Sequence, residues 1–318
     1  MQPGTFGEAM TRTDDHRRIA EYLAVAELLT PHLSGPTAHR LADVTQVSGI
    51  AGVLDGDAEP PDDEWTRWAL RRRSPDRVDY WLNEVSRLGE LGVHVVTIDD
   101  PEYPANLLMI HNRPPVLFAR GAITESDSRA MAVVGTRDAT DAGLAQASKL
   151  AGELAARQVT VVSGLARGID TAAHAAALNA GGRTIAVFGT GITRVHPRGN
   201  EPLARSIDRA GACVSQFWPD QSGARWTFPM RNVVTSGLSL GTVVVEAGES
   251  SGARLQANNA LDHGKRLFLL RELVTKQPWA QAMAVRPGVH VVDEVDEILE
   301  AVDTDLCVER ELTVELTG

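Results

Sequence analysis

The sequence predicts a doubly wound α/β fold with a mostly parallel sheet, preceded by an N-terminal helical domain. Seven short apolar runs rich in valine and isoleucine lie between residues 131 and 293, and helical segments separate most of them. Strands that are buried on both faces of a parallel sheet have this composition, and the alternating helices cover them. Right-handed crossovers then place helices on both faces of the sheet.

Residues 1–90 are expected to form the helical domain. Apolar side chains recur at helical spacing in RIAEYLAVAELL, residues 18–29, and Pro31 ends that run. Residues 64–90 show a second helical stretch, which contains three consecutive arginines at 71–73. We interpret this triplet as a solvated helix face, and a contact with nucleic acid is the alternative.

Residues 91–130 are expected to connect the helical domain to the sheet, with short strands at 94–98 and 116–118. The sheet domain spans residues 131–300, with helices at about 141–157, 170–180 and 201–210. Residues 301–318 form an acidic C-terminal tail. The seven predicted strands of the sheet domain are the apolar runs at 131–135, 159–164, 183–189, 212–217, 242–248, 265–270 and 289–293.

The net charge of −11 is atypical of a nucleic-acid-binding protein, which usually contains a basic domain. The charge is uneven along the chain, however. Residues 1–130 hold 13 basic and 21 acidic side chains, residues 131–290 hold 17 and 11, and residues 291–318 hold 1 and 10. A basic middle between acidic ends favours an anionic partner for the sheet domain.

The composition excludes several classes of protein. A hydrophobic content of 43% is enough for a packed core, which excludes wholesale disorder. No apolar run approaches the ~18 residues of a membrane helix, and the polar N-terminal stretch is not a secretory signal. Cys213 and Cys307 form neither a disulfide framework nor a zinc set, so we expect a cytoplasmic protein. The nine histidines show no metal-ligand spacing, and neither a metal nor a cofactor is expected.

The loops that follow the predicted strands are the expected ligand site, because ligands of an open α/β sheet bind beyond the carboxyl ends of its strands. Glycine lets the backbone approach a phosphate, helix N-termini offer free N–H groups, and arginine adds a fork of donors. For Gly189 and Gly191, phosphate contact and simple tight turns remain equal alternatives. The loops with arginine predict a phosphate-binding rim of Gly135, Thr136, Arg137, Ser163, Gly164, Arg167 and Gly168.

Signatures of nucleotide binding and catalysis are sparse. GTGITR at 189–194 lacks the third glycine of a dinucleotide fingerprint, and no GxxxxGK[ST] loop exists. Asp170 and His174 share one helical face and suit a tuned base, but a structural histidine is the preferred interpretation. Glu246 ends a predicted strand, where it acts as a general base or fixes a neighbouring loop by accepting N–H bonds.

Basic and aromatic residues are interleaved between Trp218 and Asn232, in a stretch expected to be a long loop before a short helix. Bases stack on aromatic rings and phosphates pair with cations in complexes with single-stranded nucleic acid. Arg231 is therefore expected to contact the ligand. For Trp226 and Phe228, base stacking and a hydrophobic anchor for the loop are equal alternatives.

Several segments of the sheet domain form a recognisable set. They are VVGTR (133–137), VVSGLARGIDTAAHAAAL (161–178), TIAVFGTG (184–191), HPRGN (196–200), FPMRN (228–232) and VVVEAGESSG (243–252), with YPANLLMIHNRPPVLFARG (103–121) upstream. Together they resemble the family of the DNA-processing protein DprA (Smf). The resemblance covers about residues 90–300, and SGLARGID at 163–170 is its most specific part.

The resemblance implies an extended Rossmann-like domain that binds single-stranded DNA in a positive pocket. It also implies a homodimer, transfer of the strand to the recombinase RecA during natural transformation, and no ordinary enzymatic activity. The DNA-binding residues carried over are those of the predicted rim, together with Arg231 and Asn232. Val233 stands where the family has a second arginine, and Arg254 is the residue expected to restore that charge. Arg254 and its neighbours Ser251 and Gly252 complete the twelve predicted DNA-binding residues.

Two other functions remain as alternatives. Nucleotide phosphoribohydrolases of the LOG (lysine-decarboxylase-like) type place Gly-Thr shortly before a catalytic glutamate, and Gly241-Thr242 precedes Glu246 here. The other is a nucleotide-sensing module without turnover. The SGLARGID loop and the arginine-bearing loop favour single-stranded DNA over both.

Overall fold

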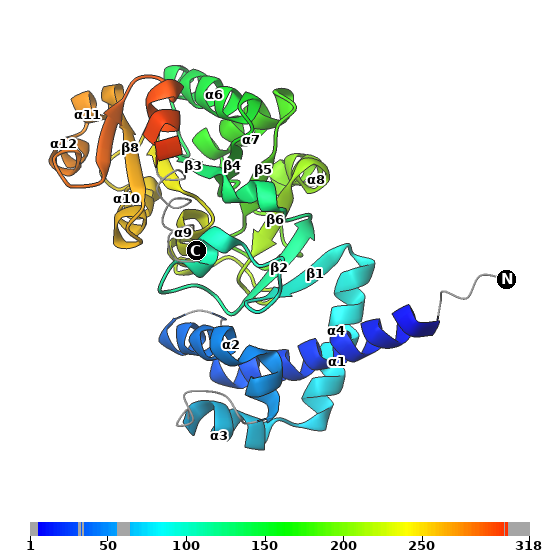
Figure 1. Cartoon of the computed structure of the whole chain (residues 1–318). Coiled ribbons are helices and arrows are strands. Elements are labelled where there is room, and N and C mark those ends of the chain that lie inside the picture. Colours follow the sequence, from blue (N-terminus) through cyan, green and yellow to red (C-terminus); the bar gives the residue numbers. More distant parts are fainter. Residues whose placement is uncertain (1–5, 31–32, 34, 56–63, 302, 305–318) are drawn as a thin grey trace, which may run out of the picture.

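The computed structural model describes residues 6–30, 33, 35–55, 64–301 and 303–304. The acidic tail beyond residue 304 therefore lies outside the described residues. The N-terminal helices are α1 (Phe6–Leu29), α2 (Pro36–Asp55), α3 (Glu64–Arg72) and α4 (Pro75–Glu90). They form a lobe of their own below the sheet, and α4 leads up to the first strand (Figure 1). The predicted helical N-terminal region is thus present.

Helix α4 begins where the sequence provides a cap. The Ser74 side chain accepts a hydrogen bond from the backbone N–H of Arg77, and Pro75 occupies the first helical position. Proline is favoured there because its missing N–H would have no helical partner. Trp81 and Leu88 on α4 pack into a buried cluster that also contains Phe118 and Phe188 of the sheet domain. The helical domain and the sheet therefore share one apolar core.

The segment between the two domains contributes to the sheet. β1 (Val93–Thr97) and β2 (Val116–Gly121) pair in antiparallel fashion, and β2 pairs antiparallel with β6. Between them lies the short helix α5 (Ala105–Leu108). The strands expected at 94–98 and 116–118 are thus present. They extend the sheet by pairing with each other and with β6, which lies about 95 residues beyond β2 in the sequence.

Within the described residues, nine strands form one sheet in the order β1-β2-β6-β5-β4-β3-β7-β8-β9. All pairs from β6 to β9 are parallel. The predicted α/β, Rossmann-like class with a mostly parallel sheet is confirmed. The parallel strands are β3 (Ala130–Val134), β4 (Thr160–Ser163), β5 (Thr184–Val187), β6 (Ala212–Ser215), β7 (Gly241–Val244), β8 (Arg266–Leu270) and β9 (Val289–Val292).

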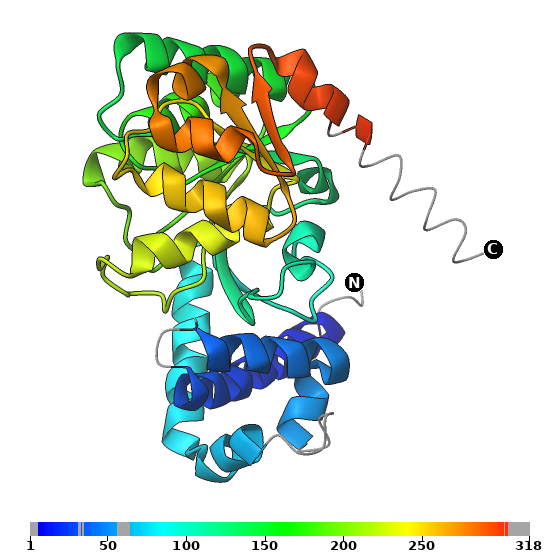
Figure 2. The ribbon, with the colours of Figure 1, turned by 90° about the vertical axis from the view of Figure 1, so that its left-hand side faces the viewer.

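Helices cover both faces of the sheet (Figures 1 and 2). One face carries α6 (Asp141–Ala156), α7 (Ile169–Asn179) and α8 (Glu201–Ala210). The other carries α9 (Thr227–Gly237), α10 (Gly252–Asp262) and α12 (Pro278–Ala284), with α11 (Arg271–Lys276) before α12. From β3 the chain builds outward to β6 and then returns to β7 on the other side of β3. Such a switch point opens a crevice for a ligand at the carboxyl ends of the strands.

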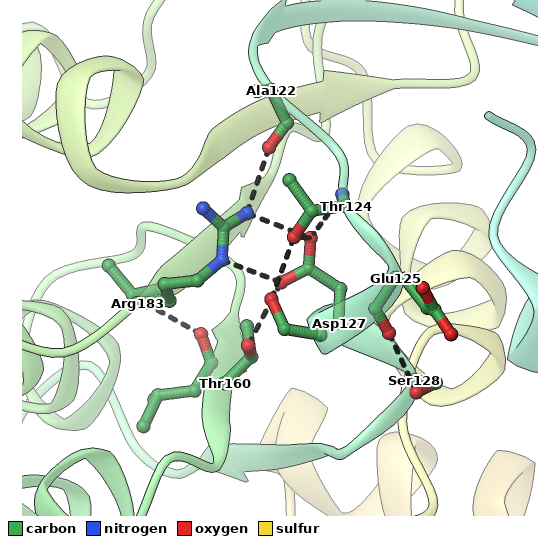
Figure 3. Close-up of polar contacts among 10 residues, drawn as sticks. Ala122, Thr124, Glu125, Asp127, Ser128, Thr160 and Arg183 are labelled. Carbon is green, nitrogen blue, oxygen red and sulfur yellow. Dashed lines mark hydrogen bonds and ion pairs between the residues drawn. The ribbon is translucent and has the colours of Figure 1, made fainter.

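A buried ion pair fastens the segment before β3 to the opposite, amino-terminal edge of the sheet (Figure 3). The guanidinium of Arg183 donates from Nε to Asp127 Oδ1 at 3.0 Å and from Nη2 to Oδ2 at 2.8 Å. The same carboxylate accepts from Thr160 Oγ1 and from the backbone N–H of Thr124. Asp127 lies on the 3-10 turn η1 (Glu125–Ser128) and is only 5% exposed.

Replacement of Asp127 by alanine is expected to lower the free energy of unfolding by about 2 kcal/mol, because Thr160 and the backbone N–H of Thr124 lose their acceptor and Arg183 keeps only the carbonyl of Ala122. The value lies below that of a fully buried pair because Arg183 is partly solvated. Urea denaturation measures the loss. Arg129→Ala, which removes an exposed pair with Asp303, serves as the control and is expected to cost less than about 1 kcal/mol. Equal losses in the two variants would contradict the prediction.

Candidate nucleic-acid interface

The loops after β3, β4 and β7 meet the first turns of α9 and α10 at the switch point of the sheet. They enclose a pocket of about 400 Å³, called the main pocket below. Phe228 and Asp170 also contribute to its wall. Eight of the twelve predicted site residues line it: Gly135, Thr136, Arg137, Gly164, Arg231, Asn232, Ser251 and Gly252.

Two glycines allow the loops after β3 and β4 to pack against each other. Gly168 has a φ of +77°, and a Cβ on it would overlap the backbone carbonyls of Thr136 and Arg137. A Cβ on Gly164 would overlap the guanidinium of Arg231. Residues with a side chain rarely adopt a positive φ. Both the backbone conformation and the lack of room for a Cβ therefore require glycine at position 168. Gly168 supports the rim through this contact and does not line the main pocket.

Arg137 is the exposed cation of the main pocket. Its guanidinium carbon lies 5.4 Å from the centre of the Phe228 ring, within the range of a cation–π contact. Among the described residues no carboxylate forms an ion pair with it. Its donors are therefore available to an anion, and the ring beside it offers a flat apolar face.

Arg167 and Arg254 flank this centre in different electrostatic states. The Arg167 side chain is 70% exposed, and its nearest carboxylate, that of Asp138, lies 3.9 Å away. Arg254 is bound by Glu249 and is absent from the wall of the main pocket. The expectation that Arg254 restores the charge lost at position 233 is therefore not supported by its contacts, because the carboxylate of Glu249, in the loop before α10, already compensates it.

Arg231 lies beneath the pocket surface and only 8% of it is exposed. Its Nη1 donates to the carbonyls of Gly164 at 2.5 Å and Val187 at 2.8 Å. Burial lowers the pKa of Arg231, and the charge of Asp170 opposes this effect. The sequence places Arg231 in a loop, whereas α9 already begins at Thr227 and directs this side chain into the sheet edge. Arg231 therefore holds the loops at the base of the main pocket together and adds a buried positive charge there.

Asp170 is the buried counterpart of Arg231. Its Oδ2 accepts from the backbone N–H groups of Gly164 at 3.2 Å and Ala166 at 3.3 Å. Burial raises the pKa of Asp170, while Arg231 and the hydrogen bonds counteract that effect. His174 does not act with Asp170 as an acid–base couple, because its Nδ1 lies 2.6 Å from Thr184 Oγ1. Burial lowers the pKa of His174 to about 3 and keeps the ring neutral, as in the structural interpretation.

Two further candidates of the sequence face away from the main pocket. Ser163 is fully buried and donates its hydroxyl to the carbonyl of Val133 at 2.7 Å, so this side chain does not line the main pocket. The carboxylate of Glu246 accepts from the backbone N–H and the hydroxyl of Thr140, at 3.1 and 2.9 Å. It faces a neighbouring cavity beside Gly143. Of the two roles considered for Glu246, its contacts match loop fixation.

Two further pockets follow the main pocket in turn, each sharing at least one lining residue with the one before it. The second, of about 340 Å³, shares Arg137, Phe228 and Arg231 with the first and adds Arg167 and His196. The third, of about 760 Å³, also contains His196 and is lined by Arg120, Arg194, Arg198 and Arg205. We call the three together the groove. Residues 194–198 are not among the predicted binding residues, although this RVHPR segment contains two arginines and a histidine.

Other ligand classes receive no support from the described part of the chain. Within it, no group of three histidine, cysteine, aspartate or glutamate side chains is arranged to hold a metal ion. Among the described helices, none has both the length and the apolar character that crossing a membrane requires.

Comparison with known proteins identifies the family. The model of the family "DNA recombination-mediator protein A" matches residues 94–303, about two-thirds of the chain. The chain belongs to this family. The DprA/Smf resemblance of the sequence is thereby confirmed. The matched region contains the whole groove but excludes α1 to α4.

Characterised members of the family show the same relationship. The DNA processing protein DprA of Bacillus subtilis is 39% identical over 180 residues, covering 56% of this chain and 61% of the relative. Protein Smf of Escherichia coli is 39% identical over 232 residues, covering 72% and 60%. The chain thus spans about 60% of the length of these relatives.

Solved structures of the family share the fold. DprA of Streptococcus pneumoniae is 27% identical and superimposes with a TM-score of 0.63, covering 83% of this chain and 95% of its own. DprA of Helicobacter pylori, described for its single-stranded DNA binding mode, has a TM-score of 0.58 at 22% identity and covers 66% of this chain and 96% of its own. The latter likeness concerns the fold alone.

Proposed function

We propose that this chain binds single-stranded DNA along the groove and acts in DNA recombination. The observation that carries the proposal is the pair formed by Arg137 and Phe228 at the centre of the groove. Single-stranded nucleic acids are bound where cations track the phosphates and aromatic rings accept the bases. An exposed guanidinium that lies against an aromatic ring offers both contacts within one nucleotide of each other.

The length of the groove favours a polymer over a mononucleotide. Each of its three pockets alone has the volume of a small-ligand site. They follow one another, with Arg167 and His196 between the main pocket and the third pocket, which contains Arg198 and is called the distal pocket below. The His196 and Phe228 rings lie 5.5 Å apart, which extends the aromatic surface towards the distal pocket. Arg120 and Arg205 are paired with Asp208 and Glu201, so Arg194 and Arg198 are the distal cations that suit further phosphates.

The relatives support the same function. Two of them are named DNA processing proteins, and the Helicobacter pylori protein is described as binding single-stranded DNA. The homodimer, the transfer of DNA to RecA, the role in transformation and the cytoplasmic location remain predictions from the family resemblance. Glu246, the main residue of the enzymatic alternative, is held by Thr140 and lines a neighbouring pocket instead of the main pocket.

Salt titration of oligo-dT binding tests the proposal. Each phosphate that a cation neutralises contributes about −0.7 to the slope of log K against log[salt] for a single strand. We expect micromolar or tighter binding of a long oligo-dT with a slope of about −2 or steeper, since several arginines line the groove. Fluorescence anisotropy at four salt concentrations measures the slope. A Glu246→Gln-sensitive release of free base from AMP, without binding of oligo-dT, would replace the proposal by the hydrolase alternative.

A further inference from the structure

Helix α4 of the helical domain contacts a loop that forms part of the groove. Arg87 donates from Nη2 to Asp220 Oδ2 at 3.2 Å. Its guanidinium is held in place by Glu84, which accepts from Nε at 2.8 Å and from Nη2 at 2.5 Å. Trp81, which lies one turn before Glu84 on the same helix, also contacts this loop. Its ring lies 4.8 Å from the ring of Trp218, which packs near Phe118. Two contacts from α4 thus bear on residues 218–220.

Asp220 in turn holds the loop that contains Thr193 and Arg194. Its Oδ1 accepts from the hydroxyl of Thr193 at 2.5 Å, and its backbone carbonyl accepts from Arg194 Nε at 2.7 Å. The carbonyl of Pro219 accepts from both the backbone N–H and the hydroxyl of Thr193. Thr193, Arg194 and Asp220 all line the distal pocket. Both loops therefore lie in the wall of the groove and are held by each other.

These two loops depend on mutual contact because little regular structure supports them. Residues 188–197 and 216–226 contain no helix or strand in the described chain. Gly191 packs so closely on the carbonyls of Trp218 and Pro219 that a Cβ would overlap them. A displacement of residues 218–220 would therefore carry residues 191–194 with it. The contact between Arg87 of α4 and Asp220 therefore connects both loops to a long helix.

We propose that the helical domain positions the distal half of the groove for DNA, with Asp220 as the positioning residue that links α4 to Arg194. The inference rests on the proposed function and adds a role for a domain that lies outside the matched family region. Docking of α4 keeps Arg194 and the neighbouring Arg198 and His196 in line with the main pocket. Strands long enough to reach the distal pocket benefit from this arrangement, whereas short ones do not.

Removal of Asp220 discriminates positioning from simple electrostatics. Asp220→Ala deletes a negative charge from the wall of a DNA groove, so charge alone predicts tighter binding. Positioning predicts the reverse for a long strand. Asp43→Ala is the matched control: Asp43 is equally exposed and also pairs across the domain boundary, with Arg113 at 2.7 Å, but it does not line the groove.

The experiment compares oligo-dT of about 6 and about 30 nucleotides in anisotropy titrations of the full chain. For the long strand we expect Asp220→Ala and Arg87→Ala each to weaken binding about threefold to fivefold, the range of an exposed ion pair. The salt slope should become shallower, Arg87→Lys should restore part of the affinity, and Asp43→Ala should leave it unchanged. For the short strand all variants should bind like the unaltered protein, with thermal unfolding midpoints that agree.

Three results would overturn the inference. They are tighter binding by Asp220→Ala, an equal loss for short and long strands, and unchanged binding by both Asp220→Ala and Arg87→Ala. Arg137→Ala, measured alongside, separates this failure from that of the proposed function. If Arg137→Ala abolishes binding while Asp220→Ala has no effect, the groove stands and only the role of the helical domain is lost. If the unaltered protein does not bind oligo-dT, the proposed function itself is lost.

Discussion

Arg137→Ala is expected to weaken the binding of oligo-dT by about tenfold to a hundredfold. The substitution removes the exposed, unpaired guanidinium at the centre of the groove, and hydrogen bonds to charged groups contribute about 1.5–3 kcal/mol each. It also removes the cation from the face of Phe228. Because one phosphate loses its partner, the slope of log K against log[salt] should decrease in magnitude by about 0.7.

Two further variants make this result specific. Arg137→Lys keeps the charge but loses the planar fork and its stacking on Phe228, so an intermediate affinity is expected. Arg209→Ala removes an equivalent charge from the exposed end of α8, outside the groove, and should leave binding nearly unchanged. If Arg137→Ala and Arg209→Ala bind oligo-dT alike, Arg137 is not the central cation of the site.

Arg231→Met is expected to destabilise the protein by about 2–4 kcal/mol, because two backbone carbonyls lose a charged donor and the buried carboxylate of Asp170 loses a nearby positive charge. Asp170 then remains as a buried carboxylate without its cation, and the carbonyls of Gly164 and Val187 lose their donor. The same substitution should abolish DNA binding, because the loop around Gly164 forms part of the main pocket. Urea denaturation together with oligo-dT titration measures both effects.

A double-mutant cycle with Asp170→Asn isolates the charge pair. Neutralising both partners removes the uncompensated carboxylate, so Arg231→Met/Asp170→Asn should be more stable than Arg231→Met alone. Full stability of Arg231→Met combined with loss of DNA binding would contradict the structural role. That outcome would restore the direct DNA contact which the sequence predicts for this arginine.

Local patterns made most of the fold predictable. The apolar runs and the helical segments between them mark β3 to β9 and α6 to α8 because strand and helix periodicities are written within a few consecutive residues. The pairing of β1 and β2 with the sheet was not predictable in this way. It depends on β6, which lies about 95 residues beyond β2 in the sequence.

The candidate site divides along the same line. The loop position of Arg137 follows from a glycine at the end of an apolar run, since the carboxyl ends of parallel strands meet at one edge. The same reasoning treats Arg231 and Ser163 as equals of Arg137, yet both are buried and bonded to backbone carbonyls of other segments. Glu246 likewise has its partner, Thr140, 106 residues away.

The sequence by itself therefore determined the fold class, the ligand edge of the sheet and the arginine-rich character of the loops there, including the family. Only the tertiary structure decided which charged groups are free to meet an anionic ligand. The net charge illustrates the reason. Arg137 and Arg254 each add one positive charge to the sum, but Glu249 compensates only Arg254. Burial and ion pairing arise from contacts between segments that folding brings together, and composition does not contain that information.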